Sequence, residues 1–84
     1  MDQKVVNPAI LNGHAGKYKG SKFTIEAVND NGVLKLKVDG KEFILRPRSD
    51  DVYYVTERNL EFIFSRERLT VLENGGVVEE ATRI

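Results

Sequence analysis

Hydrophobic and polar residues alternate along most of the chain after residue 16. The alternation is clear in residues 22–27, 34–38 and 60–64, where apolar side chains occupy every second position. A period of two places these side chains on one face of an extended strand and the intervening polar residues on the other. Residues 42–46, 52–55, 69–71 and 78–84 continue the pattern. We therefore expect a series of short strands, each with one buried face.

Turn-forming residues separate these segments at intervals of about 8–12 residues, a spacing typical of small sandwiches and barrels. The pair Asp39-Gly40 predicts a two-residue type I′ hairpin, because Asp and Gly both tolerate positive φ. Residues 29–32, 48–51 and 74–76 predict further turns. Short strands joined by successive hairpins form an antiparallel meander, and closing it removes the exposed edges. The predicted fold class is all-β: a small antiparallel up-and-down β-barrel of about eight short strands.

The N-terminal residues have a different pattern. Residues 7–13 predict one helical turn, with Asn7 as N-cap, Pro8 at the first helical position and Gly13 as a left-handed stop. Ile10 and Leu11 are its expected buried residues. Residues 1–6 are expected to form a linker or a frayed end. The predicted organisation is therefore a linker and short helical turn over residues 1–12, followed by a single β-barrel domain over residues 13–84.

The alternation also predicts which side chains fill the barrel. The expected core consists of Phe23, Leu34, Leu36, Phe43, Leu45, Leu60, Phe62, Phe64, Leu69 and Val71. Gly16 and Tyr18 are expected at the entry to the barrel. His14, the single histidine, is expected to follow the helical turn as a partly exposed ring that covers one end of the barrel. This assigns His14 a structural role.

Composition narrows the possible classes. Eighty-four residues make one domain, and the absence of cysteine excludes disulfides and cysteine-based zinc sites, so packing alone must supply the core. Residues 1–48 carry a net charge of +4 and residues 49–84 a net charge of −4. This asymmetry fits either complementary solvated faces, which we favour, or a basic docking patch. The sequence contains no apolar run of about 18 residues, so no membrane span is expected, and no signal peptide is recognised.

The sequence contains no recognisable catalytic or cofactor motif. His14 is the one possible imidazole base, and neither Gly-x-Ser-x-Gly nor Ser-x-x-Lys occurs. One histidine without cysteine cannot build a transition-metal site unless carboxylates contribute. We therefore expect a protein that is not an enzyme, with no catalytic, cofactor-binding or metal-binding residues and no cofactor. Nucleic-acid binding is a weaker alternative. Its candidate contacts are Lys17, Lys19, Lys22, Lys35 and Lys37 for phosphates and Tyr18, Tyr53 and Tyr54 for stacking.

A succession of short motifs runs through nearly the whole chain. Pro8 and Leu11 precede Gly16-Lys17-Tyr18, and a Gly-turn leads into Leu34-Lys35-Leu36. Leu45-Arg46-Pro47, Phe62-Ile63-Phe64-Ser65-Arg66 and Ala81-Thr82-Arg83-Ile84 follow in order. This succession resembles the lipocalin-like C-terminal accessory domain of bacterial serine hydrolases related to β-lactamases and penicillin-binding proteins, a domain of unknown function.

The resemblance implies a non-catalytic accessory or interaction barrel that belongs to, or derives from, a larger bacterial serine hydrolase. The catalytic serine and lysine of that family lie in a separate N-terminal domain, so no catalytic residue transfers to this chain. The resemblance implies export to the periplasm or the extracellular space, with a hydrolase domain of the parent chain as the partner. A lipocalin-like carrier of small molecules is the first alternative and a nucleic-acid-binding barrel the second. The parent protein, the ligand and the oligomeric state stay open.

Overall fold

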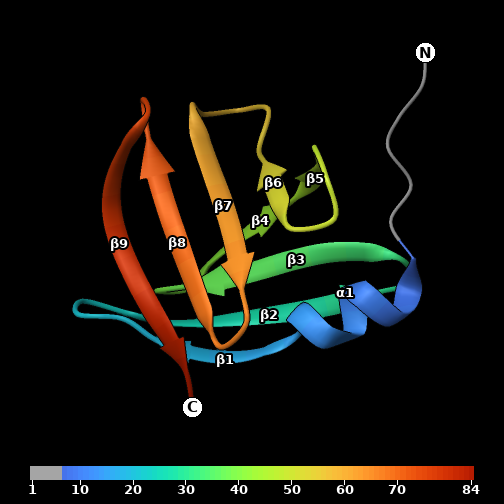
Figure 1. Ribbon diagram of the computed structural model, residues 1–84. Coiled ribbons are helices and arrows are strands. Elements are labelled where there is room, and N and C mark those ends of the chain that lie inside the picture. Colours follow the sequence, from blue (N-terminus) through green and yellow to red (C-terminus); the bar gives the residue numbers. More distant parts are fainter. Residues whose placement is uncertain (1–6) are drawn as a thin grey trace.

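A computed structural model describes residues 7–84 as one antiparallel sheet that coils into a nearly closed barrel, with a short helix packed beside it (Figure 1). The predicted all-β fold class is confirmed. In chain order the elements are α1 (Pro8–His14), β1 (Gly16–Lys19), β2 (Thr24–Asp30), β3 (Val33–Val38), β4 (Lys41–Ile44), β5 (Arg46–Pro47), β6 (Val52–Tyr54), β7 (Leu60–Ser65), β8 (Arg68–Glu73) and β9 (Gly76–Arg83).

The strand order in the sheet is β4-β3-β2-β1-β9-β8-β7-β6-β5, and every pairing is antiparallel. All neighbours are consecutive in the chain except β1 and β9, so this one pairing joins the N-terminal and C-terminal strands. The two ends of the sheet, β4 and β5, are separated only by Leu45, whose amide donates to the Leu34 carbonyl at 2.9 Å. The structure has nine strands rather than about eight because the expected strand at residues 42–46 is divided at Leu45, and because the expected entry at Gly16–Lys19 is itself a strand, β1.

Two-residue turns join several of the strands. Asp39 and Gly40 have φ values of 51° and 78°, which confirms the predicted type I′ hairpin between β3 and β4. The turns after β2 and β8 have the same left-handed pair, an asparagine followed by a glycine. The turn between β7 and β8 was not predicted. There Arg66 has a φ of 57°, in the left-handed region. Neither Arg66 nor the residues next to it are of the types that usually adopt this conformation.

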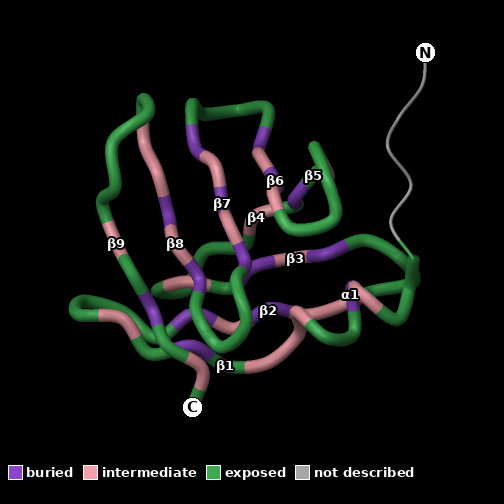
Figure 2. Tube along the Cα trace, viewed as in Figure 1, coloured by how far each residue is buried: buried purple, intermediate pink, exposed green. Residues whose placement is uncertain are grey.

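The core occupies the barrel interior, and buried residues alternate along most strands (Figure 2). The prediction is confirmed for Leu34, Leu36, Leu45, Leu60, Phe62, Phe64, Leu69 and Val71. Phe43 is half-buried and packs against this cluster. The prediction is wrong for Phe23, which is 42% exposed, because β2 begins only at Thr24 and Phe23 lies in the preceding loop. Further buried side chains come from Tyr18, Tyr53, Val55 and Ala81.

Helix α1 begins as the sequence predicts. The Asn7 side chain accepts a hydrogen bond from the Ala9 amide at 2.8 Å, and Leu11 is buried. The helix runs one residue further than expected, to His14, and Ala15 leaves it in an extended conformation. Gly13 is therefore helical and is not the left-handed stop that was predicted. No left-handed residue is needed, because the chain passes straight from α1 into β1.

The predicted division of the chain and the absence of a membrane span can be compared with the structure of residues 7–84. The expected linker at residues 1–6 lies outside the described residues, whereas the helical turn and the barrel that follow it are both present. Among the elements at residues 7–84, no helix has the length and apolar character needed to cross a membrane.

Two glycines with different backbone conformations give a matched test of these assignments. We expect Gly40→Ala to destabilise the protein by about 1–2 kcal/mol, because alanine is strained at positive φ. Gly13→Ala is expected to stabilise it by about 0.5–1 kcal/mol, because the position is helical and a Cβ there meets nothing within 4 Å. Chemical denaturation of both variants measures the two changes. A loss of stability in Gly13→Ala contradicts the helical assignment.

Candidate functional site

Strand β9 carries two charged residues on the inward face of the barrel. In the strand register, Arg83 lies opposite Tyr18, Ala81 opposite Leu69 and Glu79 opposite Val71. The four uncharged residues of these pairs are all buried. Residues that pair directly on neighbouring strands point to the same face of the sheet. Arg83 and Glu79 therefore flank the buried Ala81 on the inner face. Both side chains are half-buried, and each makes hydrogen bonds to a segment outside β9.

Arg83 binds the end of α1. Its Nη1 donates to the Ala15 carbonyl at 3.2 Å, and its Nη2 donates to the Gly13 carbonyl. Nη2 also donates to the Tyr18 hydroxyl at 2.7 Å, and that hydroxyl donates to the His14 carbonyl at 2.7 Å. The last carbonyls of a helix have no partner within the helix, and a cation there is favourable. The guanidinium therefore holds α1 against β1 and β9.

The two buried tyrosines, Tyr18 and Tyr53, keep their protons at neutral pH. Burial raises the pKa of Tyr18, although the adjacent Arg83 charge opposes the rise. Burial, with the charges of Asp51 and Asp50, raises the pKa of Tyr53 to about 12. Neither hydroxyl is therefore set up as an anionic nucleophile.

His14 fastens the same end of the helix to the turn before β6. Its Nε2 lies 2.9 Å from the Asp50 carbonyl oxygen, which can only accept, so Nε2 is the donor. The ring stacks on Phe64 with a centroid distance of 4.5 Å and meets Tyr53 edge-on at 5.8 Å. The Asp51 carboxylate lies 3.5 Å from Nε2. The ring is thus a packing element at one end of the barrel, as the sequence predicts, although it belongs to the helix instead of following it.

This cluster does not have the geometry of a catalytic triad. A general base must receive a proton from a nucleophile, whereas His14 Nε2 donates to a main-chain carbonyl. Within residues 7–84, no serine hydroxyl hydrogen-bonds His14. In the same part of the chain, no three metal-ligating side chains gather at one place. The contacts of Arg83, Tyr18 and His14 instead form a lock that fixes α1 to the barrel.

Glu79 fixes the loop between β1 and β2. Its Oε1 accepts from the Ser21 hydroxyl at 2.8 Å, and its Oε2 accepts from the Lys22 amide at 3.1 Å. A Cβ on Gly20 would overlap Glu79 Oε2, so only glycine leaves room for the carboxylate. The sequence does not predict this contact, because Glu79 and Ser21 lie 58 residues apart.

The Glu79 contact predicts a pH-dependent loop. The Lys22 amide, together with the Ser21 hydroxyl, lowers the pKa of Glu79 from its ordinary value of 4.5. A lowered pKa stabilises the folded protein above the ordinary value, and this contribution disappears as the pH falls through the folded-state pKa. We expect the protection of the Lys22 amide, measured as its exchange rate relative to the intrinsic rate at each pH, to fall below pH 4.5 in the wild type. In Glu79→Gln the exchange should be faster already at neutral pH, without that acid step. An identical acid step in both proteins contradicts the assignment.

The nucleic-acid candidates are divided by the fold. Tyr18 and Tyr53 lie in the core and cannot stack on bases. Tyr54 remains at the surface, half-buried, with the Arg48 guanidinium 5.1 Å from its ring centre. The strand register interleaves Lys17 and Lys37 with carboxylates, so the outer face of β1 to β4 is not a uniformly basic groove.

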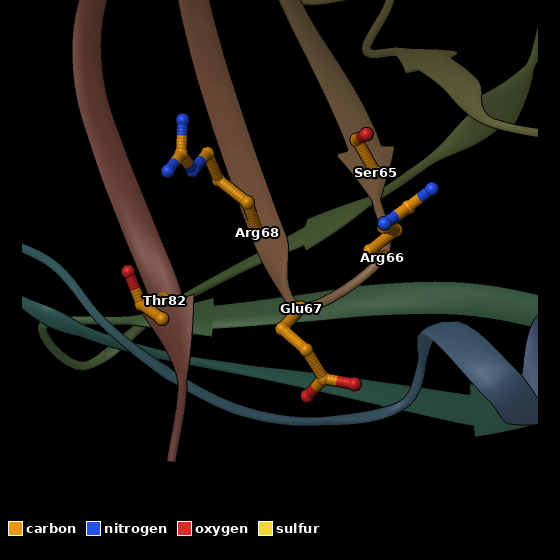
Figure 3. A pocket seen from close by; sticks show the side chains of 5 residues that line it. All are labelled: Ser65, Arg66, Glu67, Arg68 and Thr82. Carbon is orange, nitrogen blue, oxygen red and sulfur yellow. The ribbon is translucent and has the colours of Figure 1, made fainter.

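A shallow depression lies on the outside of the barrel, at the turn between β7 and β8 (Figure 3). Its volume is about 340 Å³, and it is lined by Ser65, Arg66, Glu67, Arg68 and Thr82. The charged side chains point in different directions in Figure 3, so they do not converge on one reacting atom.

The candidate sites of this protein are therefore the lock around Arg83, the loop contact of Glu79 and the outer depression. Comparison of the chain with models of protein families, with curated proteins and with solved structures found no match.

Proposed function

We propose that the chain is a non-catalytic accessory or interaction domain, part of or derived from a larger bacterial serine hydrolase. The support for the non-catalytic part of this proposal is that large side chains occupy the barrel interior. The largest fully buried ones are Tyr18, Tyr53, Phe64, Leu34, Leu36 and Leu69. The link to a hydrolase depends on the succession of sequence motifs from Pro8 to Ile84 and on nothing else.

The packing of the barrel favours an interaction domain over a carrier of small molecules. A carrier barrel needs an interior space of a few hundred Å³, lined by apolar side chains. Here Phe64 lies in contact with the rings of Tyr18, Tyr53 and His14, with centroid distances from 4.5 to 5.9 Å. The depression at the turn between β7 and β8 has suitable volume, but it lies outside the barrel and is lined by polar side chains.

The reading frame that encodes the chain gives the most direct test of the hydrolase link. We expect an upstream domain with a Ser-x-x-Lys motif in the same frame. That domain, produced separately, should bind this chain in isothermal titration calorimetry. A frame without such a domain, or two domains that do not associate and do not alter each other's activity or stability, overturns the hydrolase link.

Two assays test the non-catalytic part. The purified chain should hydrolyse neither a chromogenic β-lactam nor p-nitrophenyl acetate above the rate in buffer. It should also fail to bind a fluorescent fatty acid in a saturable manner. Saturable binding at one site per chain would favour the carrier instead. Hydrolysis that Ser65→Ala or Ser49→Ala abolishes would identify an enzyme.

A further inference from the structure

One row of neighbouring side chains crosses five strands on the outer face of the barrel without a carboxylate. In the strand register, Ser65 lies opposite Arg68, Arg68 opposite Thr82, Thr82 opposite Lys19, and Lys19 opposite Thr24. All five side chains are exposed. We call this set the hydroxyl–cation row. Because paired residues on adjacent strands are neighbours on one face, a hydroxyl and a cation alternate along its whole length.

Another outer row on the same barrel has a different composition. Lys17 lies opposite Glu26, Glu26 opposite Lys37, and Lys37 opposite Glu42. Each cation of that row has a carboxylate as its cross-strand neighbour, which offsets its charge locally. Lys17 and Lys19 lie on the same face of β1, two residues apart. The two lysines therefore differ in their cross-strand neighbours, which include a carboxylate for Lys17 and only hydroxyl side chains for Lys19.

The cations of the hydroxyl–cation row are not engaged by carboxylates. The ion pairs among residues 7–84 involve neither Arg68 nor Lys19. Glu67, the carboxylate closest in sequence to Arg68, pairs with Arg83 at 3.5 Å. Figure 3 shows Glu67 extending away from the Arg68 side chain, which leans from β8 toward β9. Glu80 is the carboxylate two residues before Thr82 on β9, and its cross-strand neighbour is Thr70.

One end of the row coincides with the outer depression. Ser65, Arg68 and Thr82 belong both to the row and to the lining of the depression, which Arg66 extends at the turn. Arg66 takes part in none of the ion pairs among residues 7–84 either. The lining of the depression thus contains two arginines and two hydroxyl side chains, together with Glu67, whose carboxylate pairs with Arg83. Lys19 lies further along the row.

We propose that the hydroxyl–cation row binds a phosphate-type oxyanion, seated over Thr82 between Arg68 and Lys19. Arginine and lysine donate charge-assisted hydrogen bonds to phosphate oxygens, and arginine can donate two in parallel. The threonine and serine hydroxyls donate to the remaining oxygens. A phosphoryl group fits this donor set because its oxygens accept from several directions at once. The inference does not depend on the proposed link to a hydrolase.

An NMR titration tests the proposal. The ¹⁵N-labelled chain is titrated with sodium pyrophosphate, with O-phosphoserine and, as a carboxylate control, with sodium acetate, all at low and equal ionic strength. We expect saturable shifts with both phosphoryl compounds, concentrated at the amides of residues 65–68, 82 and 19. Acetate should produce much smaller shifts. Saturation with pyrophosphate alone restricts the ligand to free polyphosphates, whereas saturation with both extends it to phosphate esters.

Matched variants separate a site from general attraction to a cationic surface. Arg68→Gln and Lys19→Gln should each weaken pyrophosphate binding by about tenfold, because each removes one charge-assisted contact. Lys17→Gln removes the same charge from the same face of β1 and should leave the affinity nearly unchanged. All three side chains are exposed, and a melting curve verifies that each variant folds. Equal weakening by Lys17→Gln, shifts spread over all cationic residues, or shifts that do not saturate would each overturn the proposal.

Discussion

Phe64→Ala is expected to lower the free energy of unfolding by about 3–5 kcal/mol, the usual range for removing a buried phenylalanine ring. Phe64 is 2% exposed and lies at the centre of the aromatic cluster. It stacks on His14 and meets Tyr53 and Tyr18 edge-on, at centroid distances of 4.5, 5.5 and 5.9 Å. Alanine would leave a cavity between three rings that are themselves held by hydrogen bonds, so the site cannot easily collapse.

Urea denaturation of wild type and Phe64→Ala measures this change. Val77→Ala is the matched control, because Val77 is 57% exposed on β9 and its truncation should change the stability by no more than about 0.5 kcal/mol. Small domains are stable by only about 5–15 kcal/mol, so Phe64→Ala should remove a large part of the total. If both variants unfold at the wild-type urea concentration, the aromatic cluster is not the centre of the core.

The fold was largely predictable because its connections are local. Most strands pair with the strand next in sequence, so short alternating segments and turn residues such as Asp39-Gly40 determine the neighbours directly. The prediction of buried residues failed at a position that continues the alternation but does not lie in a strand. Phe23 continues the alternation of β2 in sequence, but it lies in the loop before the strand begins, and its side chain is exposed.

The inward positions of Glu79 and Arg83 were not predictable from the same pattern. In β9 one alternation contains Glu79, Ala81 and Arg83, and the other contains Val78, Glu80 and Thr82. Hydrophobicity does not decide which set faces inward. The register shift beside Val71 and Leu72 makes Val77 the partner of Leu72 and Glu79 the partner of Val71, so Val78 is an extra residue. A bulge of this kind, together with long-range partners such as Ser21, is what turns the two charges inward.

The second large effect is expected for Arg83→Leu, which should lower the free energy of unfolding by about 2–4 kcal/mol. Hydrogen bonds to charged groups contribute about 1.5–3 kcal/mol, and each buried carbonyl left without a donor costs about 1–3 kcal/mol. The Ala15 carbonyl, whose hydrogen bond is partly buried, and the exposed Gly13 carbonyl lose their donor, and the Tyr18 hydroxyl loses one of its two partners. Part of this loss is offset because water reaches the end of α1 once the guanidinium is gone.

The role of Arg83 is tested more directly by which amides lose protection in Arg83→Leu than by the total loss of stability. If Arg83 holds α1, then hydrogen exchange at the Ala15 amide, which donates to Leu11 at 3.1 Å, should accelerate more than exchange in β7 and β8. The pKa of Tyr18 should rise further, because the Arg83 charge that now lowers it is removed.

Arg83→Lys should restore part of the charge effect but only part of the helix protection, since an ammonium lacks the fork that reaches several acceptors. Arg68→Leu, which removes an exposed arginine from β8, is the control and should leave Ala15 protected. Uniformly faster exchange in Arg83→Leu would show that Arg83 stabilises the barrel as a whole and does not act as the lock of its helix.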